Sequence, residues 1–331
     1  MSESRRAGIR QAHQIREMNA QTSKEKLIAW VRISRLQFFP MTFIAYTLGA
    51  VAQSVISDGW MAANYAAGYL VIFLIEWCTI LVNEYHDYRS DCLNQNFSIY
   101  TGGSRVLVEG KLGFRAVRTA VVLALILIVV SSVILLRLGG TASNASMIII
   151  LIGLGLGLGY TLPPVKFSYR GTGELVVGAT HSIYVILCGF VFQGGPWDHP
   201  LPWLLGLPLF FAVISANILA GIPDRKADDA VQKRSVAVIF GPRRAVVLVI
   251  LFVSFGLLSA LYLQYYGITR LPRFWFLLVS AHALFLIFLL FRLMKSGLYD
   301  RRIDQIMGFS LSYVIWFGVL PLLSLMKEYV R

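Results

Sequence analysis

Hydrophobic residues fill most of this chain in blocks of about twenty, and short polar segments separate the blocks. An α-helix needs a block of that length to cross the hydrocarbon layer of a membrane, whereas a membrane β-barrel shows shorter segments of alternating polarity. The pattern therefore predicts an all-α, polytopic membrane protein whose helices form one bundle. The nine expected spans are residues 36–56, 65–86, 116–137, 145–162, 174–193, 201–222, 244–265, 273–293 and 305–326.

No long polar segment interrupts these blocks, so residues 31–331 are expected to form a single transmembrane domain. Residues 1–30 contain no apolar core of the kind found in a secretory signal, and several of them are basic. We expect them to form a basic cytoplasmic tail.

The composition agrees with a membrane protein and excludes several kinds of site. Of the 331 residues, 57% are hydrophobic and 14% are charged, whereas a soluble domain carries about a quarter charged residues. The three cysteines and five histidines show none of the spacings of zinc or haem ligands, and nothing suggests disulfides.

The formal net charge is +13, and 25 of the 30 Lys and Arg residues fall in the N-terminal segment and the even-numbered connections. By the positive-inside rule, these parts and the N-terminus are expected on the cytoplasmic side. If the cell is bacterial, the membrane would be its inner or plasma membrane. Anionic lipid and topology account for most of the charge, so membrane lipid is an expected partner and nucleic acid is not.

Two groups of acidic residues stand at connections expected on that same side. Asn83, Asp87 and Asp91 are spaced four residues apart at the end of the second span, so on a helix they would form one stripe. Asp224 and Asp228, again four apart, follow the sixth span. Solvated acids at helix ends are the simpler interpretation of either group alone, but two matched groups on one face favour a shared site.

The residue types in these groups suit a particular chemistry. Carboxylate and amide oxygens are the ligands of hard cations such as Mg²⁺, which commonly binds one or two carboxylates together with phosphate oxygens. Two groups facing each other could therefore hold Mg²⁺ ions with a diphosphate between them. Basic side chains on the same face that could neutralise the remaining negative charge are Arg105, Lys166 and Lys233.

These residues resemble the two aspartate-rich motifs of the UbiA superfamily of intramembrane prenyltransferases. The first motif, NxxxDxxxD, would begin at Asn83, and the second, DxxxD, at Asp224. Four further segments resemble family elements: RVLVEG at 105–110, YTLPPVK at 160–166 (most like chlorophyll synthases), YRGTGE at 169–174 (most like naphthoquinone-type members) and KRSVAVIFG at 233–241.

The resemblance implies nine helices around a central cavity and Mg²⁺-dependent transfer of a polyprenyl group from its diphosphate to a lipophilic aromatic acceptor, such as a menaquinone or ubiquinone precursor. It also implies roles for particular residues. The metal ligands would be Asn83, Asp87, Asp91, Asp224 and Asp228. Arg105, Lys166 and Lys233 would bind the diphosphate, and the four aspartates with Lys166 and Tyr160 would act in catalysis, Tyr160 by stabilising an allylic cation.

The acceptor stays open, because the segment 220–223 reads AGIP where naphthoate-type members carry an Asn pair and Arg. Asn217 is a further candidate for substrate binding, although an intramembrane Asn often only bonds a neighbouring helix. Glu76 could accept a proton from the acceptor or could pair within the bundle.

Two other functions fit part of the pattern. A terpene cyclase of the same superfamily would use the same metal motifs without an external acceptor. A secondary transporter also uses intramembrane carboxylates, but those stand near the membrane centre on broken helices. The glycine-rich segment LIGLGLGLGY at 151–160 contains two small-xxx-small pairs, Gly153/Gly157 and Gly155/Gly159, and predicts close helix packing.

Overall fold

The computed structural model describes residues 22–139 and 143–329. Within these ranges, nine helical segments are long and apolar enough to cross a membrane, as the sequence predicts. They are Leu36–Ser57, Ala62–His86, Phe114–Leu138, Asn144–Thr161, Gly173–Phe192, Pro200–Ala230, Pro242–Tyr265, Arg273–Ser296 and Asp304–Glu328. Residues 1–21 of the expected tail lie outside the described residues.

Eight of these spans contain one long helix each: α3 (Phe39–Ser57), α4 (Ala62–His86), α6 (Phe114–Leu138), α7 (Ser143–Thr161), α10 (Pro200–Ala230), α12 (Pro242–Tyr265), α13 (Arg273–Ser296) and α14 (Asp304–Tyr329). The fifth span is divided into α8 (Gly173–Ala179), a π-helical segment η4 (Thr180–Tyr184) and α9 (Val185–Phe192). The shorter helices are α2 (Ser23–Ile33), η1 (Leu36–Phe38), α5 (Tyr88–Leu93), η3 (Phe167–Tyr169) and α11 (Val236–Phe240).

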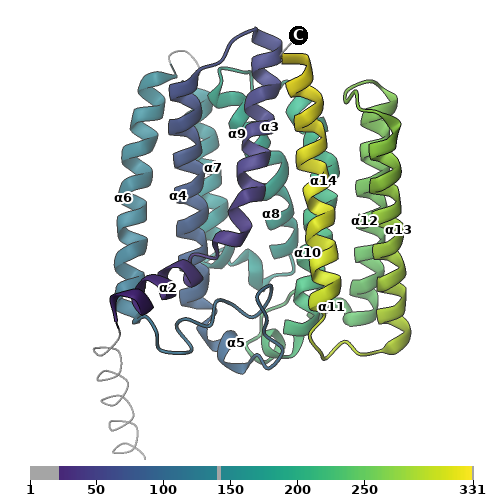
Figure 1. The fold of residues 1–331 in the computed structure, drawn as a ribbon. Helices are drawn as coiled ribbons and strands as arrows, with labels where there is room; N and C mark the ends of the chain where they lie inside the picture. The colour runs from purple at the N-terminus through teal and green to yellow at the C-terminus, as the bar shows by residue number, and fades with distance from the viewer. Residues whose placement is uncertain (1–21, 140–142, 330–331) are drawn as a thin grey trace, which may run out of the picture.

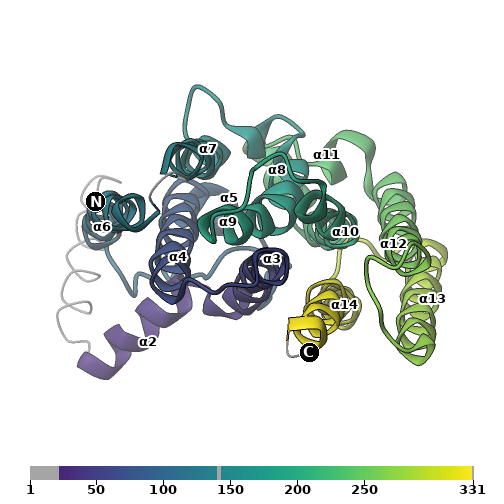
Figure 2. The same cartoon turned by 90° about the horizontal axis from the view of Figure 1, so that it is seen from above.

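The long helices stand side by side, and the short helices α2, α5 and α11 gather at one end of the bundle (Figure 1). Seen along the bundle, α4, α3 and α14 face a second row formed by α7, α9, α8 and α10, with α6 and the pair α12 and α13 on the flanks (Figure 2). The two rows are in contact through α3 with α9, α4 with α7 and α10 with α14.

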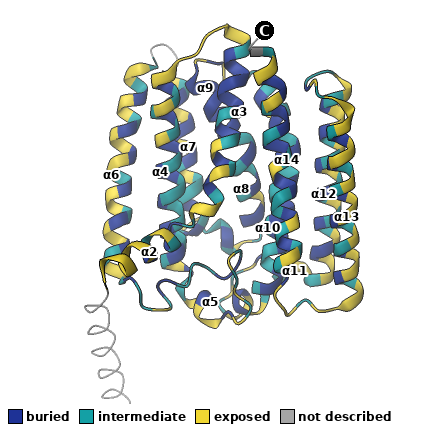
Figure 3. Cartoon of the chain, in the orientation of Figure 1, coloured by how far each residue is buried: buried dark blue, intermediate teal, exposed yellow. Residues whose placement is uncertain are grey.

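Burial follows this arrangement. The flanking helices α6 and α13 expose much of their outer faces, whereas the central helices are largely buried (Figure 3). The exposed residues of the flanking helices are mostly aliphatic or aromatic, including Leu123, Val129, Leu277 and Leu284. Apolar side chains on the outside of a bundle are the pattern of a surface that faces lipid rather than water.

Glycines allow the helices of the two rows to approach closely. A Cβ atom on Gly49 of α3 would overlap the backbone of α9, and one on Gly189 of α9 would overlap the backbone of α3. In α7, a Cβ on Gly153 would overlap the Tyr184 hydroxyl and one on Gly157 would overlap the Thr79 hydroxyl. The close packing predicted for the glycine-rich segment is therefore confirmed for the Gly153/Gly157 pair.

The second pair behaves differently. A Cβ on Gly155 would meet no atom within 4 Å, and one on Gly159 would make only ordinary contacts with Val165 and Phe167. The prediction of close packing is wrong for this pair, because Gly155 is exposed and Gly159 faces the side chains of Val165 and Phe167 at ordinary contact distance.

Helix α10 is longer than the sequence pattern predicts. It continues for two turns beyond residue 222 and ends at Ala230, although Pro223 lies within it. Asp224 and Asp228 therefore lie on the last turns of the sixth span and do not follow it. A side chain on this helix is held more rigidly than one on a connection.

Candidate active site

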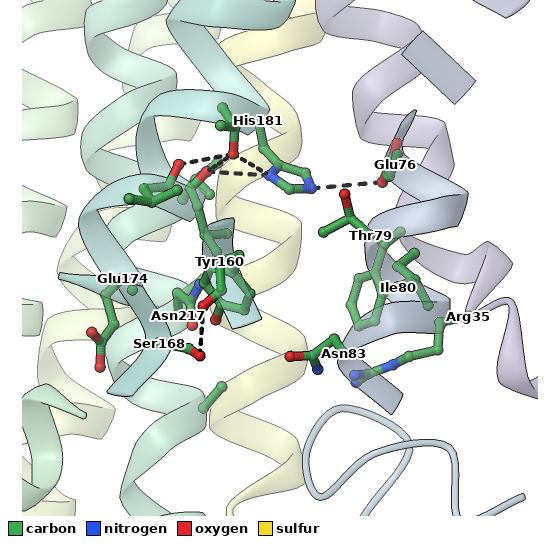
Figure 4. A pocket seen from close by; sticks show the side chains of 18 of the residues that line it. Arg35, Glu76, Thr79, Ile80, Asn83, Tyr160, Ser168, Glu174, His181 and Asn217 are labelled. Atoms are coloured by element: carbon green, nitrogen blue, oxygen red, sulfur yellow. Dashed lines mark hydrogen bonds and ion pairs between the residues drawn. The ribbon is translucent and has the colours of Figure 1, made fainter. Parts of the chain in front are cut away.

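A cavity of about 550 Å³ lies between the two rows of helices. Its walls come from α3, α4, α5, α7, α8, η4, α10 and α14, together with the connection after α5. Figure 4 shows part of it, with α4 residues such as Thr79 and Asn83 on one wall and Tyr160, Glu174 and Asn217 on the other. A cavity of this size is in the range that binds small organic ligands.

The three residues of the first acidic group all line this cavity. These residues do not lie on one continuous helix, because α4 ends at His86, as the predicted span 65–86 does, and α5 begins at Tyr88. Helical hydrogen bonds nevertheless continue across the boundary between α4 and α5. The backbone N–H of Asp87 donates to the Asn83 carbonyl at 2.8 Å, and that of Asp91 donates to the Asp87 carbonyl at 2.9 Å.

The second acidic group lines the same cavity, and Lys233 connects it to the first. The Lys233 ammonium donates to Asp87 Oδ2 at 2.7 Å and lies 3.6 Å from Asp228 Oδ1. The Tyr169 hydroxyl donates to the other Asp87 oxygen at 3.3 Å. Asp87 and Asp228, which are more than a hundred positions apart in the sequence, therefore both lie beside the Lys233 ammonium.

Hydrogen bonds hold the connection after α5 to Asp224 and to Glu84, which is next to Asn83. Asp224 accepts hydrogen bonds from the Asn94 side chain at 2.7 Å and from the backbone N–H of Gly102 at 3.2 Å. Buried Glu84 accepts two more from Ser104, at 2.8 Å from its backbone N–H and 2.6 Å from its hydroxyl. Charge-assisted bonds of this kind are stronger than neutral ones, so the connection is held firmly over the acids.

Gly102 and Gly103 give this connection its path. Both have positive φ angles, +74° and +71°, which glycine adopts without steric cost. A Cβ atom on Gly103 would also overlap the Asp91 carboxylate. Glycine is thus required at 103 both for the backbone conformation and for the space that Asp91 occupies.

Negative charge accumulates at this end of the cavity. Burial, together with the carboxylates of Glu84 and Asp87, raises the pKa of Asp91 to about 8. Burial alone would lower the pKa of Lys233, but the carboxylates of Asp87 and Asp228 outweigh it and hold that pKa well above its usual value. Apart from Lys233, the only basic side chain with a formal charge that lines the cavity within the described residues is Arg35.

The donor set fits a divalent cation that is shared with a phosphate ligand. Within the described residues, no group of three His, Cys, Asp or Glu side chains is arranged to hold a metal ion alone. Mg²⁺ commonly takes one or two carboxylates and completes its shell with water and phosphate oxygens. Burial and the neighbouring carboxylates of Glu84 and Asp87 raise the pKa of Asp91, and a cation bound beside it would oppose that rise.

Residues 39–311 match the model of the UbiA prenyltransferase family, which is most of the chain. The chain belongs to the UbiA prenyltransferase family. It is therefore a prenyltransferase and an integral membrane protein, and the resemblance of its motifs to this family is confirmed.

Two curated relatives have names that differ in chemistry, since one names a dihydroxynaphthoate substrate and the other a glyceryl phosphate product. The chain is 25% identical over 231 residues to 1,4-dihydroxy-2-naphthoate octaprenyltransferase of Bacillus subtilis (strain 168), covering 67% of this chain and 68% of the relative. It is 27% identical over 232 residues to digeranylgeranylglyceryl phosphate synthase of Methanosphaera stadtmanae, covering 69% of this chain and 75% of the relative.

Solved structures show the same fold. A structure described as digeranylgeranylglyceryl phosphate synthase superposes with a TM-score of 0.61 at 17% identity, covering 92% of this chain and 99% of the other. A UbiA homologue from Archaeoglobus fulgidus bound to GPP and Mg²⁺ gives a TM-score of 0.56 at 14% identity, covering 87% of this chain and 99% of the other.

Within this UbiA fold, most of the residues predicted from sequence come together. The cavity-lining set comprises Asn83, Asp87, Asp91, Tyr160, Asn217, Asp224, Asp228 and Lys233. Arg105 and Lys166 are not among the lining residues. The Arg105 guanidinium donates to the Asp91 backbone carbonyl and stacks 4.3 Å from the Phe97 ring centre, and the Lys166 ammonium lies 4.7 Å from the Tyr169 ring centre.

The sequence reasoning missed several residues that shape the site. They are Arg35, Glu84, Asn94, Ser104, Tyr169 and His181. Glu84 carried a usable signal, because it is an acid next to Asn83 at the end of an apolar span. The others are single polar residues whose importance depends on contacts between distant parts of the chain.

Proposed function

We propose that this UbiA-family enzyme transfers a polyprenyl group from its diphosphate to a lipophilic hydroxyaromatic acceptor in a Mg²⁺-dependent reaction, as in the synthesis of a membrane quinone such as menaquinone. The convergence of both acidic groups on one cavity, with Lys233 bonded to Asp87 and beside Asp228, is the observation that carries this proposal. It supports a single diphosphate site built from both halves of the chain.

In this proposal Asn83, Asp87, Asp91, Asp224 and Asp228 hold the metal. Bound Mg²⁺ would supply positive charge to the diphosphate and stabilise it as the leaving group. Lys233 and Arg35 line the cavity and add two further positive charges at the same end. Their side chains are placed to stabilise the negative charge that grows on the diphosphate as the allylic carbon–oxygen bond breaks.

Arg105 and Lys166 take part less directly. Arg105 fixes the backbone of Asp91, and Lys166 lies over the ring of Tyr169, whose hydroxyl bonds Asp87. Both residues therefore position the acids, and both add positive charge near the diphosphate.

The rest of the cavity suits a carbocation and an apolar ligand. Aliphatic residues of α3, α4 and α14 form much of its wall, including Ile44, Ile72, Leu311 and Val314. Such a wall keeps water away from the allylic cation while the acceptor attacks it. The Tyr160 ring lines the cavity and could stabilise that cation through its face.

The name of the Bacillus relative supports a hydroxynaphthoate-like acceptor, and the YRGTGE segment resembles naphthoquinone-type members. The name of the Methanosphaera relative is the reason to test a glyceryl phosphate acceptor beside it. The distribution of basic residues supports an active site on the cytoplasmic side of the membrane.

The test is an assay of purified protein with Mg²⁺ and labelled prenyl diphosphates of several chain lengths. The acceptors are 1,4-dihydroxy-2-naphthoate, 4-hydroxybenzoate and geranylgeranylglyceryl phosphate. The proposal expects diphosphate release and a prenylated aromatic product that require Mg²⁺. It also expects Asp87→Ala and Asp224→Ala to lower turnover by at least about 100-fold.

Other outcomes would contradict the proposal in different ways. A cyclised prenyl product formed without any acceptor would identify a terpene cyclase. No diphosphate release from any prenyl diphosphate would favour a transporter, and prenylation of the glyceryl phosphate alone would exclude the aromatic acceptor.

A further inference from the structure

The cavity contains a second polar group, away from the metal-binding acids. Glu76 of α4 and His181 of η4 both line it, and Figure 4 shows them facing each other from opposite walls. Glu76 precedes Asn83 by seven residues, which is two helical turns, so both lie on the same face of α4 about 10 Å apart along its axis. This position is inside the apolar span and not at its end.

The contacts of this pair are incomplete. His181 Nε2 lies 3.6 Å from Glu76 Oε1, which is beyond ordinary hydrogen-bond distance. The Glu76 side chain is only 8% exposed, and neither of its carboxylate oxygens accepts a hydrogen bond from any residue in the described ranges. A buried carboxylate without hydrogen bonds is costly, so this arrangement suits a ligand that supplies one.

The other ring nitrogen shows how His181 is oriented. His181 Nδ1 lies 3.2 Å from the Val177 carbonyl and 3.1 Å from the Thr180 hydroxyl. A proton on Nδ1 satisfies both contacts, because the carbonyl can only accept and the Thr180 hydroxyl already donates to Val176. Nε2 therefore faces Glu76. When the ring is protonated, Nε2–H can donate to a ligand oxygen atom that lies beside the pair and also contacts Glu76.

The local backbone aims His181 into the cavity. η4 is one π-helical turn in the middle of the fifth span, and such turns inside α-helices are frequent at functional sites. The Thr180 and Ser182 hydroxyls donate to the carbonyls of Val176 and Gly178, at 2.8 and 2.6 Å, and so fix the segment that carries His181.

We propose that Glu76 and His181 bind the hydroxyl group of the aromatic acceptor and remove its proton. This inference rests on the proposed function, because it assigns the acceptor to the cavity that holds the prenyl diphosphate. The hydroxyl donates to a Glu76 oxygen and accepts from His181 Nε2–H, which completes the hydrogen bonds of both. The separation of about 10 Å from Asn83 leaves room for one or two aromatic rings between this pair and the diphosphate.

The proposed reaction transfers one proton to Glu76 and exchanges one carbon–oxygen bond for one carbon–carbon bond. The O–H proton moves to Glu76, the electron pair of that bond moves into the ring, and a ring carbon bonds the allylic carbon. The allylic carbon–oxygen bond breaks, and its electron pair leaves with the diphosphate. The substituted ring carbon then loses its proton to the released diphosphate, and Glu76 returns its proton to the ring oxygen, which restores the hydroxyl and the free carboxylate.

A neutral hydroxyl is also the group that this site selects. The negative charge of Glu76 disfavours a carboxylate or phosphate at the same position, and a hydrocarbon tail offers it no hydrogen bond. Anionic groups of an acceptor are therefore expected to point away from Glu76.

The experiment compares 1-naphthol with its methyl ether, 1-methoxynaphthalene, which has no O–H to donate, by equilibrium dialysis against the purified full-length protein. Wild type is expected to bind 1-naphthol at least about tenfold more tightly. Glu76→Gln and His181→Gln are expected to remove most of that preference. Glu328→Gln, an acid of α14 that does not line the cavity, is the matched control and should keep it.

Equal affinity of wild type for the two probes would overturn the proposal, and this comparison needs no variant to fold. A preference that both variants retain would also overturn it and would leave the pair as a structural contact within the bundle.

Binding of a labelled prenyl diphosphate with Mg²⁺ is measured on the same samples. It should change by less than about twofold in Glu76→Gln, because the variant site lies two helical turns from Asn83. Absence of prenyl diphosphate binding in wild type would contradict the proposed function. The comparison of the two aromatic probes would still show whether Glu76 and His181 bind a hydroxyl group.

Discussion

Lys233 and Asp91 contribute in different ways to the electrostatics of the cavity. Lys233 occupies the position between Asp87 and Asp228 and neutralises part of their charge. Asp91 forms no ion pair within the described ranges. Burial, Glu84 and Asp87 raise the pKa of its carboxyl to about 8, against the opposing charges of Lys233 and Arg35. A cation bound beside Asp91 would therefore replace a proton, so its binding should strengthen as the pH rises toward 8.

The contact between Gly103 and the Asp91 carboxylate can be tested by substitution, because Gly110 offers a matched control. Both have positive φ, +71° and +67°, so alanine costs about 1–2 kcal/mol of backbone strain at either position. Only at Gly103 would the new Cβ overlap Asp91, whereas at Gly110 it would meet nothing within 4 Å. We expect Gly103→Ala to lower turnover by about 100-fold, as a small displacement of a catalytic group can.

The Gly110→Ala variant should stay within about threefold of wild type in the same prenyl transfer assay, since a strained surface turn costs stability and not catalytic geometry. Equal losses in the two variants would mean that strain, and not the Asp91 contact, explains the effect.

Two features of the helices shape the cavity: the close contact between α7 and α4, and the length of α10. α7 meets α4 at Gly157 and Thr79, and α10 extends far enough to place Asp224 and Asp228 opposite the first acidic group. The break between α4 and α5 turns the chain while the spacing of the first acids is kept.

The contact between α7 and α4 can be tested with Gly157→Ala and its control Gly155→Ala. Alanine favours a helix over glycine by about 1 kcal/mol, so Gly155→Ala, at an exposed position, should keep or raise the thermal midpoint in detergent. Gly157→Ala should lower it, because the overlap with Thr79 costs about 1–3 kcal/mol. A midpoint for Gly157→Ala that equals or exceeds that of Gly155→Ala would contradict the described packing.

At the scale of the whole molecule, the sequence predicted the nine spans closely, because length and apolarity alone determine them. It also predicted which acids share a site, because Asn83, Asp87, Asp91, Asp224 and Asp228 keep the spacing of a family motif. The partner of Glu76 could not be predicted. His181 is 105 positions away, and only the packing of α4 against the fifth span brings the two together.

The orientation of the molecule can be measured with a native thiol. Cys92 of α5 is exposed beside Asp91, whereas Cys78 and Cys188 are buried. If the acidic end is cytoplasmic, a membrane-impermeant maleimide should label Cys92 in inside-out vesicles and not in intact cells or right-side-out vesicles. Labelling of Cys92 in right-side-out vesicles would reverse the orientation, and the Cys92→Ser variant shows which signal belongs to this residue.

The proposed function requires that the acidic groups at 83–91 and 224–228 bind one diphosphate together. Its most direct test is the affinity for geranyl thiolodiphosphate, which is not cleaved readily, in the presence of Mg²⁺. We expect Asp87→Asn and Asp224→Asn each to weaken binding by about 100-fold. Asp300→Asn, which changes an exposed acid outside the cavity, should bind like wild type. Wild-type affinity in either Asp87→Asn or Asp224→Asn would contradict this requirement.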